Sequence, residues 1–229
     1  MKESVLVIAA HPDDEILGCG ATIAKHINQG NEVNLLIMVE GATSRNKQRN
    51  PEDCKNQLAT LNSESQKAST ILGANLLDLM NLPDNRLDSL DLIDIVKLIE
   101  EQIISIEPSI IYTHHFGDMN IDHQIINRAV LTAARPKPNN RIKKIFSFEV
   151  LSSTEWNPTS KNHQFMPNWY EEISQFLPKK LEAAEAYKSE MCNWPHPRSI
   201  ESIKHLALMR GSQVGIESAE SFCLLRSIN

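Results

Sequence analysis

The sequence has little of what marks secreted, membrane-spanning or nucleic-acid-binding proteins. Its 229 residues include four cysteines without paired spacing, which favours free thiols in a reducing compartment. No apolar run approaches the roughly 20 residues that a membrane helix needs. No basic stripe stands out against a net charge of −6, which argues against a general nucleic-acid surface. We therefore expect a cytoplasmic protein with no membrane span and no nucleic-acid partner.

Two hydrophobic patterns alternate regularly along the chain. Short apolar runs predict buried strands over residues 4–10, 32–39, 75–79, 109–113 and 144–151. Apolar residues three or four apart predict helices over residues 16–29, 57–72, 90–106 and 123–134, with two further helices over about 178–190 and 199–211. Strands that alternate with helices at this pitch are typical of βαβ units. The pattern predicts an α/β, Rossmann-like fold, with a mostly parallel sheet flanked by helices.

The domain organisation is expected to be simple. With 41% hydrophobic residues, the chain can bury a sizeable core, and it shows no repeat and no convincing linker. We therefore expect a single domain over residues 1–229. Its C-terminal part, about 152–229, is less regular and is expected to contribute to the substrate pocket.

Two polar corners follow strands of the predicted sheet. The stretch AHPDDE (residues 10–15) comes directly after the first strand and carries three carboxylates, and a second group of His and Asp residues follows the strand at 109–113. The carboxyl ends of parallel strands share one edge, where ligands bind. Imidazoles and carboxylates from separate turns are ligands that zinc accepts, so a cation at this edge would explain the crowded anions. The alternative, a helix cap by Asp13 or Asp14, accounts for one carboxylate but not for His11.

Several smaller features have ordinary structural interpretations. Glu15 is expected to stabilise the turn or the helix start. Gly18 and Gly20 lack the spacing of a dinucleotide fingerprint, so they are expected to allow a helix to pack closely on the sheet. The aromatic residues between 156 and 194 favour core or lid packing, with stacking on a sugar as the alternative.

The motifs resemble those of a known family. AHPDDE after a hydrophobic strand, followed by NIDH (residues 120–123), is similar to the PIG-L/LmbE-like deacetylases, which are zinc-dependent enzymes that remove N-acetyl groups from amino sugars and their conjugates. The stretches HPRS, RGSQVG and AESF resemble the C-terminal part of members that handle small glycosides. The resemblance implies zinc, or another divalent ion, held by His11, Asp14 and His123. It also implies that Asp13 is the general base.

The second corner departs from one common form of the family, His-x-x-Asp-His. Asn120 stands at the first position, and an amide donates a hydrogen bond but cannot deliver a proton. The general acid therefore stays open. Either Asp13 performs both proton transfers, or the second group comes from another residue, for which the candidates are His114, His115 and His196.

The remaining site residues are interpreted from their neighbourhood. Asp122 is expected to orient His123 or its neighbours, to cap the helix that begins there, or to do both. Arg45 follows the second strand and is a candidate for contact with substrate. His196 and Arg198 are the other two candidates, and an Arg suits a carboxylate or phosphate on the aglycone.

The leading hypothesis is a metal-dependent hydrolase that removes an N-acetyl group from a small-molecule amino sugar. A second hypothesis keeps the metal and hydrolyses another amide or a carbamoyl group on a glycoside. A third, of another class, is a non-catalytic sugar- or nucleotide-binding module. A homo-oligomer is left open, because the sequence shows no exposed apolar stripe that would establish one.

Overall fold

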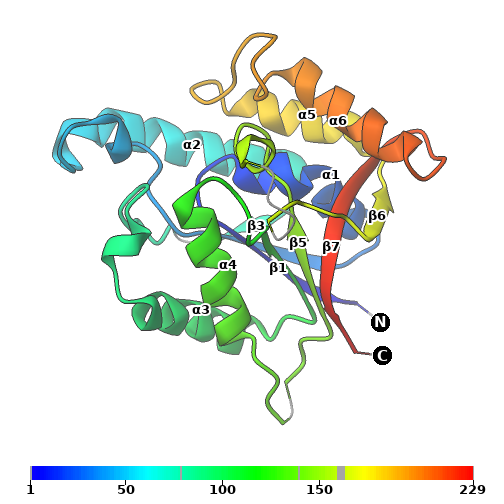
Figure 1. Ribbon diagram of the computed structural model, residues 1–229, viewed down its shortest axis with the longest axis horizontal. Helices are drawn as coiled ribbons and strands as arrows, with labels where there is room; N and C mark the ends of the chain where they lie inside the picture. Colours follow the sequence, from blue (N-terminus) through cyan, green and yellow to red (C-terminus); the bar gives the residue numbers. More distant parts are fainter. Residues whose placement is uncertain (1, 78, 139, 159–162, 229) are drawn as a thin grey trace.

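The sheet is mixed but mostly parallel. The computed structural model describes residues 2–77, 79–138, 140–158 and 163–228. In this described part, seven strands form a sheet in the order β3-β2-β1-β4-β5-β7-β6 (Figure 1). The strands are β1 (Ser4–Ala9), β2 (Glu32–Ile37), β3 (Asn75–Leu76), β4 (Ile110–His114), β5 (Lys144–Phe148), β6 (Trp169–Glu172) and β7 (Ala219–Ser227). Strands β1 to β5 pair in parallel, whereas β7 is antiparallel to β5 and β6. The predicted α/β class is confirmed.

Helices cover both faces of the sheet (Figure 1). One face is covered by α1 (Asp14–Asn28), α2 (Lys55–Leu72), α5 (Leu177–Ala186) and α6 (Ile200–Ser212), and the other by α3 (Leu92–Ile106) and α4 (Ile121–Ala133). Along β1, Val5 and Val7 pack on the α1 side, and Leu6 and Ile8 pack on the α4 side. Burial on both faces is why the strands read as continuous apolar runs. Among the described residues, no helix combines the length and apolarity needed to cross a bilayer.

The structure differs from the sequence prediction mainly in the C-terminal part. Strands β6 and β7 were not predicted, because β7 is buried only over its first half and β6 is only partly buried. Helix α5 ends at Ala186 rather than at Glu190. The strand expected over residues 75–79 is limited to β3, and residue 78 lies outside the described residues.

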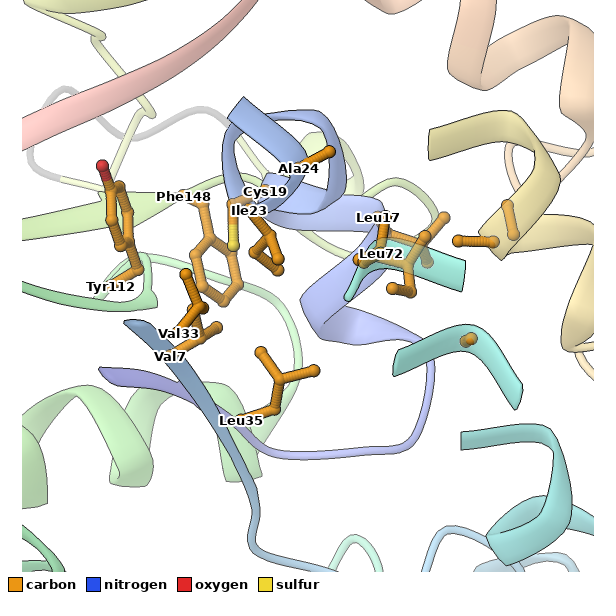
Figure 2. Packing of buried hydrophobic residues seen from close by; sticks show 14 of the residues in the cluster. Val7, Leu17, Cys19, Ile23, Ala24, Val33, Leu35, Leu72, Tyr112 and Phe148 are labelled. Atoms are coloured by element: carbon orange, nitrogen blue, oxygen red, sulfur yellow. The ribbon is translucent and has the colours of Figure 1, made fainter. Parts of the chain in front are cut away.

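Gly18 allows α1 to lie directly on the sheet. A Cβ atom at this position would overlap the ring of Phe148 on β5. Figure 2 shows that ring beside α1, next to Cys19 and Ile23. At Gly20, a Cβ atom would lie 3.2 Å from side-chain atoms of Ile16 and Lys180. The prediction of close helix–sheet packing at Gly18 is confirmed.

We expect Gly18→Ala to destabilise the fold by about 1–3 kcal/mol, because overpacking a buried ring outweighs the gain in helix propensity of at most about 1 kcal/mol. Urea unfolding measures the difference. The double variant Gly18→Ala/Phe148→Leu should recover part of the loss, because leucine has no ring at the point of overlap. A single variant as stable as the wild type would contradict this account.

Helix α1 is broken at Cys19, where φ is −149° and ψ is 25°. Two buried charged side chains from later elements bond to the backbone at the break. Glu220 on β7 accepts the N–H groups of residues 21 and 22, at 3.0 and 2.7 Å. Lys180 on α5 donates to the carbonyl of Leu17 at 2.8 Å and to Glu220 at 2.6 Å. The start of α1, which carries the polar corner, is therefore held in place by α5 and β7.

Candidate metal centre

The turn after β1 directs its carboxylates to different partners. Asp13 has left-handed backbone angles, φ 107° and ψ −26°, which cost a residue other than glycine about 1–3 kcal/mol. Its side chain makes no capping hydrogen bond. Asp14 Oδ2 instead accepts the N–H of His11 at 2.8 Å. Glu15 accepts the Tyr187 hydroxyl at 2.5 Å and the N–H of Asp13 at 3.2 Å, so it stabilises the turn. A side-chain cap therefore does not explain Asp13 or Asp14.

Three potential ligand atoms from the two corners converge. His11 Nδ1 lies 3.1 Å from Asp14 Oδ2 and 3.2 Å from His123 Nε2, and His123 Nε2 lies 3.1 Å from the same Asp14 oxygen. Ligands around a tetrahedral zinc with bonds of about 2.0–2.1 Å lie about 3.3 Å apart. The donor set, two imidazole nitrogens and one carboxylate oxygen, also suits zinc. The three side chains predicted as ligands thus fit a divalent cation.

The second nitrogen of each imidazole faces a carboxylate. His123 Nδ1 lies 3.2 Å from Asp118 Oδ1. His11 Nε2 lies 3.3 Å from Asp84 Oδ1 and 3.3 Å from Asp122 Oδ2. Carboxylates behind ligating histidines fix the tautomer and the ring orientation. Asp84 and Asp118 were not predicted from the sequence, and the requirement for a carboxylate behind each ligating histidine is the signal that could have found them.

Asn120, and not Asp122, caps α4. Asn120 Oδ1 accepts the N–H of Asp122 at 2.8 Å, and its amide donates to Asn85 at 2.9 Å. The predicted cap by Asp122 is wrong because the helix begins at Ile121, two residues earlier than expected. Asp122 accepts the N–H groups of residues 85 and 87, at 2.7 and 3.0 Å, and it lies behind His11 instead of His123.

The converging ligand atoms border a cavity of about 200 Å³. Residues 150–153, Glu190 and Arg198 are among the residues that line it. Two of the predicted site residues, Asp122 and His196, are not among the described residues that line the cavity. The other predicted site residues all line it: His11, Asp13, Asp14, Arg45, Asn120, His123 and Arg198.

Each of the three histidines considered as alternative proton donors has a backbone partner. His114 is fully buried, its Nε2 accepts a backbone N–H at 2.8 Å, and burial lowers its pKa well below the usual value. His115 Nε2 lies 3.0 Å from a backbone carbonyl, and His196 Nδ1 accepts a backbone N–H at 3.1 Å. In the described structure none of the three lines the cavity. Asp13, which does line it, is better placed for proton transfer.

Asp13 belongs to a chain of charged side chains along the cavity. Its Oδ2 accepts from Arg198 Nη1 at 3.2 Å, and the same Nη1 lies 3.1 Å from Glu190. Glu190 also accepts two hydrogen bonds from Arg45, at 2.6 and 2.8 Å. Burial and the charge of Asp14 raise the pKa of Asp13 well above the usual carboxyl range, and Arg198 opposes this shift. Glu190 was not predicted as a site residue because the sequence placed it at the end of an expected helix, whereas it follows α5 in an irregular segment.

We expect Asp118→Asn to weaken zinc binding by about 10–100-fold, because His123 loses the carboxylate that orients it. Competition with a chromophoric chelator measures the affinity. The exposed Asp94 on α3 provides a matched control, Asp94→Asn, that should bind zinc as the wild type does. Equal zinc affinity for Asp118→Asn and the control would refute the supporting role.

Two relatives from bacteria have similar sequences. The chain is 28% identical over 194 residues to the protein called uncharacterized deacetylase YaiS of Escherichia coli (strain K12), covering 82% of this chain and 92% of that protein. It is 24% identical over 194 residues to the probable N-acetyl-alpha-D-glucosaminyl L-malate deacetylase 2 of Bacillus anthracis, covering 82% of each.

Solved structures share the fold. The N,N'-diacetylchitobiose deacetylase from Pyrococcus horikoshii matches with a TM-score of 0.75 and 18% identity, over 97% of this chain and 83% of that one. GalB, the 4-carboxy-2-hydroxymuconate hydratase from Pseudomonas putida KT2440, matches with a TM-score of 0.74 and 21% identity, over 100% and 98%. The fold thus also occurs in an enzyme named for another reaction, and fold alone does not specify the chemistry. The family is shown instead by sequence: the model for PIG-L, GlcNAc-PI de-N-acetylase, matches residues 6–134, more than half of the chain, so this protein belongs to the PIG-L family of deacetylases.

Proposed function

We propose that this protein is a zinc-dependent hydrolase that removes the N-acetyl group from an amino sugar or its conjugate. One observation carries the proposal. A carboxylate free of capping, Asp13, lines the same cavity as three ligand atoms that lie within 3.2 Å of one another. A binding module for sugars would not require both a cation site and a spare carboxylate beside it.

The proposed reaction divides the work between the cation and the chain. Zinc held by His11, Asp14 and His123 would act as a Lewis acid toward water and the acetyl carbonyl. Asp13 takes a proton from the water that attacks the acetyl carbon. When the C–N bond breaks, Asp13 returns this proton to the amine nitrogen, and acetate leaves. The same carboxyl group performs both transfers, which accommodates an asparagine at position 120.

The names of related proteins support an N-acetylglucosamine-type substrate, since they include a glucosaminyl malate deacetylase and a chitobiose deacetylase. The lining of the cavity by residues from both ends of the chain supports a single domain over residues 1–229. A cytoplasmic location stays a prediction, and the oligomeric state stays open.

The test is acetate release by the zinc-loaded protein from a panel of N-acetylated amino sugars, with the free amine quantified in parallel. We expect equal amounts of acetate and amine. N-carbamoyl and N-formyl versions of the same sugar test the alternative hydrolase, which would prefer one of them. Sugar binding without bound zinc or turnover would favour the non-catalytic module and refute the proposal.

A further inference from the structure

One buried carboxylate engages both arginines that line the cavity. The side chain of Glu190 is 6% exposed. It accepts two hydrogen bonds from Arg45, at 2.6 and 2.8 Å, and one from Arg198 at 3.1 Å. Arg198 also donates to Asp13. Among the described lining residues, Arg45 and Arg198 are the arginines, and no lysine lines the cavity. Neither guanidinium is therefore left without a carboxylate partner inside the protein.

The backbone holds Glu190 in this position. Its N–H donates to the carbonyl of Tyr187 at 3.0 Å. The preceding residue, Ser189, donates its N–H to Glu64 on α2 at 3.1 Å and its hydroxyl to the same carboxylate at 2.5 Å. The N–H of Cys192 donates to the carbonyl of Arg198 at 3.0 Å, which ties the two segments together. Glu190 is thus fixed between the arginines before any substrate enters.

The charges around the cavity give an anionic ligand little to bind. Four carboxylates line it, those of Asp13, Asp14, Asp84 and Glu190. The two arginines and a divalent cation, when bound, would offset these four negative charges without a surplus. An anionic group that approached either arginine would also approach Glu190, and like charges brought together in a protein site oppose binding strongly.

From this arrangement we propose that the cavity selects uncharged N-acetylated amino sugars over conjugates with an anionic aglycone, and that Glu190 sets this preference by occupying Arg45 and Arg198. The inference rests on the proposed deacetylase function. Glu190 acts as a specificity-determining residue through the arginines. Substrate hydroxyl groups can accept from the remaining guanidinium N–H groups, whereas a carboxylate or phosphate at the same N–H groups would lie beside the negative charge of Glu190.

The experiment compares two substrates that differ in the aglycone: methyl N-acetyl-glucosaminide and N-acetylglucosaminyl L-malate. We expect the wild type to show a kcat/KM for the methyl glycoside about tenfold or more above that for the malate conjugate. In Glu190→Gln, the ratio should move toward the malate conjugate by about tenfold, and the shift should shrink at high salt. Because the readout is the ratio of two kcat/KM values, a general loss of activity in the variant cancels. Glu101→Gln, at an exposed position of α3, removes the same charge and should leave the ratio unchanged.

Two outcomes would overturn the preference: a wild type that prefers the malate conjugate, or a ratio that Glu190→Gln does not change. If neither compound loses its acetyl group, the proposed function fails in this assay. The preference is then decided by calorimetric binding of methyl glucosaminide and glucosaminyl malate to the zinc-loaded protein. Tighter binding of the malate compound by the wild type would refute it there.

Discussion

Replacing Asp13 by asparagine should lower kcat for acetate release by about 10²–10⁴-fold while zinc still binds. The amide has the same shape as the carboxyl group but cannot take a proton from water. The left-handed backbone at this position, φ 107°, is one that asparagine tolerates as well as aspartate does. The ligand atoms belong to other residues, so the cation site should persist. Steady-state kinetics and metal analysis by mass spectrometry measure the two quantities on the same sample.

The interpretation depends on a matched control for this variant. Asp88→Asn, at an exposed position in a short turn before α3, makes the same chemical change away from the cavity and should keep wild-type kcat. An Asp13→Asn variant with wild-type kcat would exclude Asp13 as the base. An inactive variant without zinc would show that residue 13 is needed to hold the ion.

Replacing Glu220 by alanine should lower the free energy of unfolding by about 3–5 kcal/mol, because it leaves the charge of Lys180 buried without its partner. The N–H groups of residues 21 and 22 lose their acceptor in the same variant. Urea unfolding of the metal-free protein measures the loss without a contribution from zinc binding.

The pair formed by Lys25 and Glu171 provides the comparison. Its N–O distance is also 2.6 Å, but its side chains are 23% and 21% exposed, against 5% and 4% for Lys180 and Glu220. A partly solvated pair contributes about 1 kcal/mol or less. Glu171→Ala should therefore lower the free energy of unfolding much less than Glu220→Ala does. Equal losses would exclude the role that we assign to Glu220 at the break in α1.

The sequence predicted the parts of the fold that leave a local pattern. Strands β1, β2, β4 and β5 are apolar runs because helices bury both of their faces, and α3 shows a clear period of three to four residues. The corner at residues 10–15 could be located because it follows a strand directly. That the two polar corners meet followed from the rule that parallel strands end at one edge. The choice of His11, Asp14 and His123 as ligands came from the resemblance to the family.

The remaining features depend on contacts between distant residues. Glu190 reaches Arg45 across 145 positions of the chain, and no local pattern marks such a pair. Asp118 faces His123 and Asp122 faces His11, and the sequence alone does not show which carboxylate lies behind which histidine. Strand β7 combines a buried half with an exposed half, so its periodicity is weak.

The contact between Glu220 and α1 also bears on the order in which the protein is made. Ala21 and its acceptor are 199 positions apart, so nearly all of these residues must be translated before the first helix gains its missing hydrogen-bond acceptor. A nascent chain that has not yet released β7 from the ribosome cannot fix the start of α1. We therefore expect a cation to be captured after translation of β7, although two of the three proposed ligands, His11 and Asp14, are among the earliest residues to emerge.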